Sequence, residues 1–301
     1  MSTNFLADVV AQKRAAIAQL KDHLSTQRTR ERALEIRKPA APHRLLHALN
    51  AKSPRLRIIA EFKRRSPSAG LIRSDLSAAE VARQYEAGGA CAISVLTDEI
   101  YFGGSISDLA AVRAGTELPL LRKDFIIDPI QIHETAINGG DAVLLIVAAL
   151  DDALLSQLRE VAEDQLGLDA LVEVHTSEEL RRAIAARASI IGVNNRNLQT
   201  LQVSLETSER LIAEAPRDKI MVSESGLQSV KSLRHLQKIG FDSFLIGEAL
   251  MRASDPEAAL RDLIATAKDH KNVQISCSHR PVAGRPGRPD GAQRRGYRPS
   301  I

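Results

Sequence analysis

Short apolar runs recur along the middle of the chain and predict a series of strands. From about residue 57 to residue 267, these runs alternate with longer stretches whose apolar residues follow the helical period. The runs are almost continuously apolar, as expected of parallel strands buried on both faces. Eight strands are predicted, over residues 57–63, 90–96, 119–123, 141–147, 169–174, 190–194, 220–223 and 243–247.

Helix start and stop signals lie between the predicted strands. Residues 77–80 (Ser-Ala-Ala-Glu) and 176–179 (Thr-Ser-Glu-Glu) have the spacing of a capping box. Asp255 precedes a proline at a first helical position, and glycine pairs at 88–89 and 139–140 predict helix ends. Eight strands that each precede a helix predict a (β/α)8 TIM barrel, with an open doubly wound sheet as the alternative.

The two ends of the chain differ from this pattern. Within residues 1–50, apolar residues recur at helical spacing among lysines and arginines, which predicts one or two helices packed before the barrel. The barrel itself is expected to span residues 51–270. Residues 271–301, the tail, are rich in proline and glycine and have few large apolar side chains. Burial there cannot offset the entropy of ordering the chain, so we expect a disordered tail.

Charge and cysteine content narrow the class of protein. The chain has a net charge of +4, but residues 271–301 contain seven Lys or Arg and one acid, a net +6, which leaves −2 for residues 1–270. The basic charge therefore belongs to the tail rather than to a folded nucleic-acid-binding face. Cys91 and Cys277 form no metal-ligand motif. With no long apolar run and with Asp8 near the start, we expect a cytoplasmic protein without membrane or nucleic-acid partners.

Polar residues end several of the predicted strands, which is where a TIM barrel places its catalytic groups. On the first strand, alternation puts Glu61 and Lys63 on one face, so an acid and an ammonium share the barrel mouth if that face is inward. The third strand ends in Lys123, where we expect partial burial to lower the pKa and permit general-acid catalysis. The simpler alternatives are a structural salt bridge for the first pair and a solvated loop position for Lys123.

The fifth and sixth strands add further candidates. The fifth ends in Glu173, and we assign His175 to the following turn. The sixth ends in Asn194 and Arg196, and an arginine binds phosphate bidentately. An Asn-rich turn is the simpler interpretation of that segment.

Glycines follow the seventh and eighth strands. Barrels often bind phosphate with the loops after these two strands, where glycine lets backbone N–H groups approach the anion. The residues concerned are Glu224, Ser225 and Gly226 after the seventh strand, and Gly247 and Glu248 after the eighth. Together the strand ends predict a phosphorylated substrate and proton-transfer or lyase chemistry, with no metal site.

Five motifs occur at these strand ends in a fixed order. They are IAEFKRRSPS at 59–68, LTDE with a following Phe and Gly-Ser at 96–105, LRKDFIIDP at 121–129, GVNNRNL at 192–198 and SESG at 223–226. Together they resemble the motifs of the indole-3-glycerol phosphate synthase family, over residues 5–268. The N-terminal segment also resembles the extra helices of that family.

The resemblance implies a reaction of tryptophan biosynthesis. The substrate would be 1-(2-carboxyphenylamino)-1-deoxyribulose 5-phosphate, and ring closure with loss of CO2 and water would give indole-3-glycerol phosphate. Lys123 matches the general acid that protonates the ketose carbonyl oxygen, and Glu173 matches the acid/base glutamate. Glu61 and Lys63 match the first-strand pair that assists proton transfer, and Asn194 lines the site. The iminium intermediate draws electrons from the departing carboxylate, so the resemblance implies no cofactor.

The resemblance also implies the binding residues. Ser66 lies in the loop that covers the substrate, and Phe125 supports the anthranilate ring. Glu224 and Ser225 line the site. The phosphate is expected to bind Arg196, Gly226, Gly247 and the backbone at Glu248.

The chain departs from the family pattern at three positions. Ile130 stands where many members have tyrosine, and Leu201 and Ser204 replace a phenylalanine and an aspartate. None of the three is expected to touch a catalytic group. The tail lies outside the pattern and is too short for a second barrel, so we expect a monofunctional enzyme that is a monomer or weak homo-oligomer.

Two other functions are alternatives. One is another phosphate-binding barrel isomerase, such as phosphoribosylanthranilate isomerase, against which the combination of Lys63 and Lys123 argues. The other is a protein that binds RNA or an acidic partner through its basic tail, with salt-dependent affinity. The tail has Tyr297 as its single aromatic ring, which is unlike single-strand binders.

Overall fold

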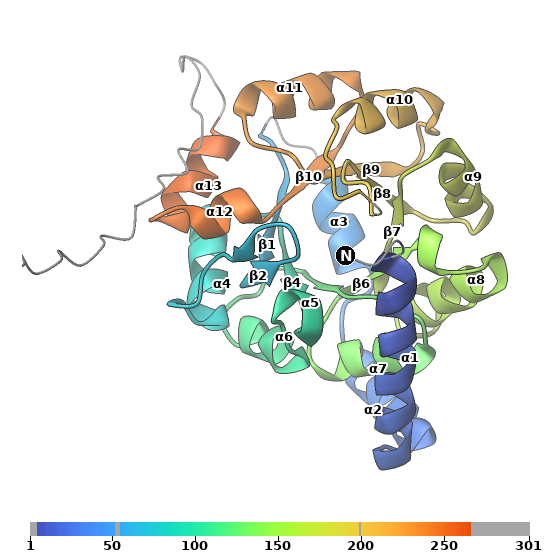
Figure 1. Ribbon diagram of the computed structural model, residues 1–301. Helices are drawn as coiled ribbons and strands as arrows, with labels where there is room; N and C mark the ends of the chain where they lie inside the picture. The colour runs from blue at the N-terminus through green and yellow to red at the C-terminus, as the bar shows by residue number, and fades with distance from the viewer. Residues whose placement is uncertain (1–4, 52–54, 199, 266–301) are drawn as a thin grey trace, which may run out of the picture.

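The structure, a computed structural model, describes residues 5–51, 55–198 and 200–265. Its centre is a closed barrel in the strand order β1-β10-β9-β8-β7-β6-β5-β4, seen end-on in Figure 1. The strands are β1 (Ile58–Phe62), β4 (Ala92–Leu96), β5 (Leu120–Lys123), β6 (Ala142–Ile146), β7 (Asp169–Val174), β8 (Ile190–Asn194), β9 (Ile220–Glu224) and β10 (Ser243–Ile246). All pairings between neighbours are parallel. The predicted TIM barrel and all eight strands are therefore confirmed, each strand end to within two residues.

Helices surround this barrel and fill the connections between strands (Figure 1). They are α4 (Ala78–Ala87), α5 (Glu99–Phe102), α6 (Ile106–Arg113), α7 (Pro129–Ile137), α8 (Asp152–Glu160), α9 (Ser177–Ala185), α10 (Glu206–Glu214), α11 (Val230–Ile239), α12 (Glu248–Arg252) and α13 (Pro256–Ile264). A 3-10 turn (Val147–Ala149) precedes α8, and a π-helical turn (Val161–Gln165) follows it. A short hairpin of β2 (Arg65–Ser66) and β3 (Gly70–Leu71) follows β1.

Capping signals explain where several helices begin. At α4, the Ser77 hydroxyl accepts from the Glu80 N–H and the Glu80 carboxylate accepts from the Ser77 N–H, which confirms the predicted capping box. At α9, Thr176 caps the Glu179 N–H as predicted. The return bond is different, because the Glu179 carboxylate accepts from the His175 N–H at 2.7 Å rather than from Thr176. The prediction of a second capping box is therefore correct for the Thr176 cap and wrong for the return bond from Glu179.

Side-chain alternation divides the core into two parts. Ile59, Leu121, Leu171 and Leu245 belong to a cluster inside the barrel. Their strand neighbours, such as Phe244, belong to a larger cluster between the strands and the helices. The same alternation carries Glu61, Lys123 and Glu173 to the inner face, two residues beyond these apolar side chains. The interior is thus apolar at depth and charged at its C-terminal end.

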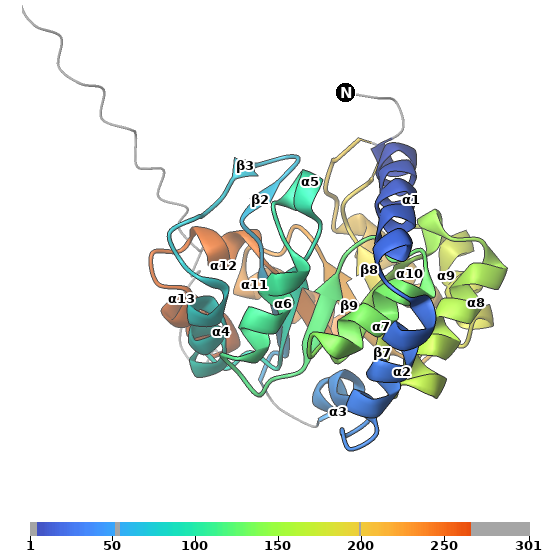
Figure 2. The ribbon, with the colours of Figure 1, turned by 90° about the horizontal axis from the view of Figure 1, so that it is seen from below.

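The N-terminal helices pack against the barrel at both ends. They are α1 (Phe5–His23), α2 (Thr26–Arg37) and α3 (Arg44–Asn50). Figure 2 shows α3 at the end of the barrel opposite the β2–β3 hairpin. There Leu45 and Leu49 are fully buried in the interior cluster. Arg44 donates to Asp141 and His43 lies 3.1 Å from Asp169, so α3 is joined to the strand starts by charge as well as by apolar packing.

Two further predictions concern the C-terminal tail and the absence of membrane spans. The predicted disorder of residues 271–301 falls outside the described residues. Within the part that is described, no helix is both long and apolar enough to cross a membrane.

Candidate active site

A cavity of about 490 Å³ opens at the C-terminal ends of the strands. The structure brings all the predicted site residues to its walls: Glu61, Lys63, Ser66, Lys123, Phe125, Glu173, Asn194, Arg196, Glu224, Ser225, Gly226, Gly247 and Glu248. Apolar side chains complete the lining, among them Leu96, Phe102, Leu144, Ile146 and Leu245. The cavity also includes Phe5 from α1, which the sequence did not single out. Charged groups therefore occupy one part of a largely apolar pocket.

Lys123 lies at the centre of the charged groups. Its Nζ is 3.3 Å from Glu173 Oε2 and 3.4 Å from Glu224 Oε2. Burial alone lowers the pKa of the lysine, but the nearby carboxylates, including that of Glu61, outweigh burial and raise it. Our expectation of a lowered pKa was therefore wrong, since it considered the lysine without the three acids that converge on it from other strands. Lys123 remains protonated and presents N–H donors to the cavity.

The two carboxylates beside Lys123 differ in their acidity. Burial raises the pKa of Glu173, but the charges of Lys123 and His175 and a hydrogen bond from Asn194 outweigh burial and lower it. For Glu224, burial dominates over Lys123, the carboxylates of Glu173 and Glu61 add repulsion, and the pKa rises to about 7. Neighbouring carboxylates with separated pKa values can take different acid and base roles. Glu173 is the more acidic member of this pair and is ionised at neutral pH.

Two glycines make room for buried carboxylates. A Cβ added at Gly247 would lie 2.2 Å from Glu61 Oε1, and a Cβ at Gly192 would lie 2.2 Å from Glu224 Oε1. Glu61 also pairs with Lys63, with Oε1 and Nζ 2.6 Å apart. Any larger residue at position 247 would displace this ion pair. A glycine within a strand often marks such a close approach, which is the signal that Gly192 offered in the sequence.

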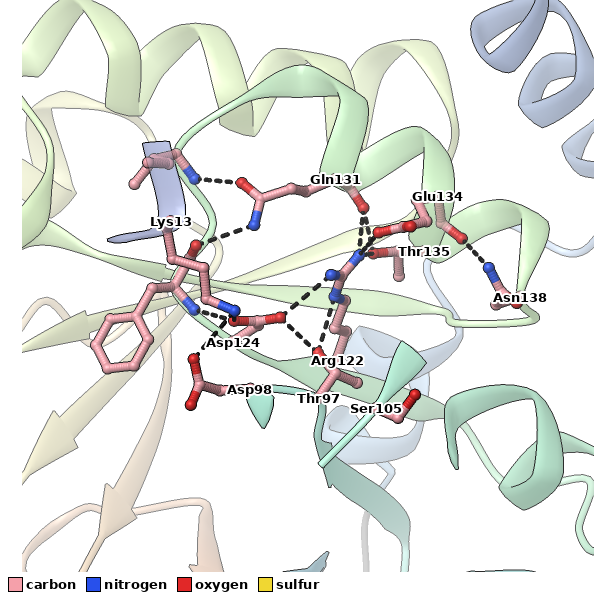
Figure 3. A network of polar contacts seen from close by, with 12 residues as sticks. Lys13, Thr97, Asp98, Ser105, Arg122, Asp124, Gln131, Glu134, Thr135 and Asn138 are labelled. Atoms are coloured by element: carbon pink, nitrogen blue, oxygen red, sulfur yellow. Dashed lines mark hydrogen bonds and ion pairs between the residues drawn. The ribbon is translucent and has the colours of Figure 1, made fainter. Parts of the chain in front are cut away.

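A polar network supports the segment that follows Lys123 (Figure 3). The buried Asp124 accepts from the Phe125 N–H at 2.8 Å, from Thr97 at 2.6 Å and from Arg122 at 3.1 Å. Lys13 of α1 reaches the same carboxylate at 2.7 Å. Burial raises the pKa of Asp124, but Arg122 and Lys13 outweigh it and lower the pKa. The N-terminal helix is thus bound directly to the residue between Lys123 and Phe125, a contact that no local sequence pattern predicted.

His175 makes a contact with the site that the sequence did not predict. It precedes Thr176, the N-cap of α9, and so belongs to the turn as assigned. Its Nε2 also lies 3.4 Å from Glu173 Oε1. The two-residue spacing from Glu173 was the available signal, because alternate residues of a strand share a face.

The rim of the cavity is formed by loops. Ser66 is buried, and its hydroxyl accepts from the Ala69 N–H at 3.2 Å within the β2–β3 hairpin. Arg196 donates to the Leu201 carbonyl at 3.0 Å, and Leu201 itself lines the cavity with a φ of 60°. The substitution at position 201 therefore alters the wall of the pocket, at a residue whose backbone carbonyl holds the Arg196 guanidinium.

Metal-binding geometry is not found at these walls. Over the described ranges 5–51, 55–198 and 200–265, no group of three or more His, Cys, Asp or Glu side chains is arranged to hold a metal ion.

Comparison with known proteins gives the family. The family model described as indole-3-glycerol phosphate synthase matches residues 6–263. The chain belongs to the indole-3-glycerol phosphate synthase family. Two proteins named indole-3-glycerol phosphate synthase align over most of their length. That of Acidithiobacillus ferrooxidans is 42% identical over 263 residues, which is 87% of this chain and 98% of the relative. That of Mycolicibacterium vanbaalenii is 44% identical over 269 residues, or 89% and 96%.

Solved structures of other activities share the fold. A thiamine phosphate pyrophosphorylase from Pyrococcus furiosus superposes with a TM-score of 0.53 at 18% identity, over 69% of this chain and 93% of that one. KGPDC from Streptococcus mutans has a TM-score of 0.53 at 13% identity, over 69% and 95%. At these identities the likeness concerns the barrel alone. The family assignment therefore rests on the sequence relatives.

Proposed function

We propose that the chain converts 1-(2-carboxyphenylamino)-1-deoxyribulose 5-phosphate to indole-3-glycerol phosphate, with loss of CO2 and water. Membership of the synthase family and the shared name of the relatives support this reaction. The observation that carries the proposal is the cluster of Lys123, Glu173 and Glu224 in the cavity. It places a protonated donor and two carboxylates of different acidity within one pocket.

Ring closure is assigned to Lys123 as general acid. Its ammonium stays protonated beside the carboxylates and donates to the ketose carbonyl oxygen as the aromatic carbon attacks. The attack leaves an iminium cation next to the substrate carboxylate, and the carboxylates around Lys123 stabilise that positive charge. The C–C bond electrons then neutralise the cation as CO2 leaves.

The proton transfers that expel water are assigned to Glu173 together with the Glu61–Lys63 pair. Glu173 is ionised because its pKa is lowered, so it serves as a base. Lys63 lies 2.6 Å from Glu61, so a donor and an acceptor sit side by side at the end of β1. Both groups line the cavity, within reach of one bound substrate.

The substrate phosphate is assigned to the loops after β8, β9 and β10. Arg196, Ser225, Gly226, Gly247 and Glu248 line the cavity there. A guanidinium and glycine-rich backbone match the chemistry of a phosphate dianion. The carboxylate of Glu248 pairs with Arg252, so its backbone rather than its side chain is the proposed contact.

Phe125 and Ser66 complete the substrate site. The buried ring of Phe125 is proposed to support the anthranilate ring, and the hairpin that carries Ser66 to cover the substrate.

The cellular setting is part of the same proposal. A reaction on a soluble phosphorylated intermediate supports a cytoplasmic enzyme without a nucleic-acid partner. We also propose that the enzyme is a monomer or weak homo-oligomer. Light scattering coupled to size-exclusion chromatography gives the mass in solution, and a stable oligomer would contradict the proposed monomer or weak homo-oligomer.

The test is turnover of the carboxyphenylamino-deoxyribulose phosphate, followed by the fluorescence of the indole product. The parent should turn over, and Lys123→Ala should lose about two or more orders of magnitude in kcat, as expected when a general acid is removed. Lys238→Ala, which removes a lysine of α11 outside the cavity, is the matched control and should keep the parent rate.

The outcomes separate function from residue assignment. Turnover that survives in Lys123→Ala would keep the reaction and move the acid role, with Lys63 as the next candidate. A folded parent protein that makes no indole product would overturn the proposed function.

A further inference from the structure

The imidazole of His175 lies between two carboxylates. Its Nε2 is 3.4 Å from Glu173 Oε1, and its Nδ1 is 3.2 Å from Glu179 Oε2. The side chain is 12% exposed, and its buried Nε2 has no hydrogen-bond partner in the described part of the chain, so its contact with Glu173 is an ion pair. Of the acceptors in the described part of the chain, Glu173 is the one that this nitrogen faces at ion-pair distance. The histidine therefore contacts Oε1 of the proposed catalytic base, whose Oε2 faces Lys123.

Glu179 fixes the orientation of this ring. Its Oε2 accepts from the His175 backbone N–H at 2.7 Å as well as facing Nδ1. Its own backbone N–H is held by the Thr176 cap at the start of α9. The ring is therefore attached to both the end of β7 and the first turn of α9, with little freedom to rotate.

The two acceptors together select the charged form of the ring. A neutral imidazole has one N–H, so one of its nitrogens would present a lone pair to a carboxylate. Only the imidazolium presents an N–H to both Glu173 and Glu179 at once. Burial lowers the pKa of His175, but the carboxylates of Glu179, Glu173 and Glu224 outweigh it and raise the pKa. Arg210 of α10 also lies beside His175, and it donates to the His175 carbonyl oxygen rather than to the ring.

Glu173 requires a charged donor at Oε1, the carboxylate oxygen that does not face Lys123. Its Oε2 faces Lys123 at 3.3 Å, and Asn194 supplies a further hydrogen bond. A carboxylate that takes up protons in each turnover must return to the same orientation with Oε2 toward the substrate. A charged donor on Oε1 achieves this, because it holds the carboxylate plane and favours the ionised form.

We propose that His175, oriented by Glu179, is a positioning residue that holds Glu173 in its reactive orientation through the ion pair between Nε2 and Oε1. This role rests on the proposed function, because it acts through the base of that reaction. It adds a carboxylate–imidazolium–carboxylate array, Glu173–His175–Glu179, to the site. The array is complete only while the imidazole is protonated, so kcat should decline as the pH rises through the titration of His175.

The kinetic test compares His175→Gln and His175→Leu with the parent between pH 6 and pH 9. Glutamine keeps a donor that does not titrate, and leucine has none. His175→Leu should lower kcat by roughly ten- to a hundredfold, as expected for the loss of a cation that pairs with a buried carboxylate. His175→Gln should lose less, and the decline of kcat at alkaline pH should flatten. KM should change by less than about twofold in both variants, because the substrate contacts remain.

Control variants separate this role from packing and from other titrating groups. His235→Gln removes a surface histidine whose Nε2 lies 2.8 Å from Glu209, and it should leave both kcat and the pH profile unchanged. Glu224→Gln removes a carboxyl of the site whose pKa is raised to about 7, and the alkaline decline should persist in it. Unfolding temperatures of all variants identify any that are simply destabilised.

An NMR titration tests the array without catalysis. The pKa of His175, followed by its imidazole 15N shifts, should lie above the ordinary value of 6.5 and fall in both Glu173→Gln and Glu179→Gln. A His175 pKa that is insensitive to Glu173→Gln, or parent-like kcat and pH profile in His175→Leu, would overturn the positioning role. Absence of turnover in the parent would reject the proposed function instead and leave the NMR result as the measure of the array.

Discussion

Replacing Glu224 by glutamine should stabilise the protein at alkaline pH while impairing catalysis. The carboxylate is buried, and burial together with the repulsion from Glu173 and Glu61 exceeds the attraction of Lys123. Its pKa is therefore raised from 4.5 to about 7. Glutamine has nearly the same shape as a protonated glutamate, so it fits beside Gly192 without a new contact. The substitution removes the cost of ionising a buried acid and little else.

The magnitude and its sign follow from the pKa. A carboxyl with a raised pKa in the folded state contributes stability that is fully present below about pH 4.5 and is lost as the pH rises through about 7. The shift from 4.5 to about 7 corresponds to about 3 kcal/mol at alkaline pH. Glu224→Gln should thus match the parent near pH 4.5 and exceed it by about 3 kcal/mol at pH 8.5. For a chain of this size that is roughly 6–12 °C in Tm.

Thermal unfolding of parent and variant across pH 5 to 8.5 measures this difference. Glu61→Gln is a useful comparison because its carboxylate already pairs with Lys63 at 2.6 Å, so its loss should destabilise rather than stabilise. A Glu224→Gln protein whose Tm advantage is absent at pH 8.5, or equal at pH 5 and pH 8.5, would refute the reasoning. The kcat of Glu224→Gln should fall even though the fold is more stable, as expected where an active site retains a costly charge.

Three further outcomes follow from the geometry. Gly247→Ala should reduce kcat by roughly tenfold or more and lower Tm, because the new Cβ would displace the Glu61 carboxylate from its ion pair with Lys63; a parent-like kcat would contradict the steric argument. Lys13→Met should lower the free energy of unfolding by about 1–3 kcal/mol in denaturant titrations, since it removes one partner of the buried Asp124. Deleting residues 271–301 should leave kcat and KM unchanged, and a protein that binds through the tail would instead lose salt-dependent affinity for RNA.

The strands and the inward-facing acids were predictable because they depend on local alternation. A two-residue period puts Glu61 and Lys63, or Leu171 and Glu173, on one face whatever the rest of the chain does. Contacts between distant segments were not predictable in this way. Lys13 reaches Asp124 from a helix far away in the sequence, and only the folded position of α1 shows the pairing.

The prediction for the pKa of Lys123 was wrong for the same reason. From its own segment the lysine is a partly buried ammonium, for which burial alone lowers the pKa. Its actual neighbours come from β1, β7 and β9, and their charges reverse the direction. Glu179 is a subtler case, because its spacing correctly indicated a helix start. The carboxylate nonetheless bonds to His175, one residue earlier than a capping box requires.

The docking of α3 on the far end of the barrel has a consequence for how the chain folds during its synthesis. Helix α3 is made early, yet it contacts β7 and β9, and its neighbour His43 faces Asp169. Its binding surface is complete only after β9 has left the ribosome. Leu45 and Leu49 of α3 therefore stay exposed in the nascent chain until most of the barrel has been translated. Pairings of such long sequence separation form late and slowly, so this segment is where a chaperone would be most useful.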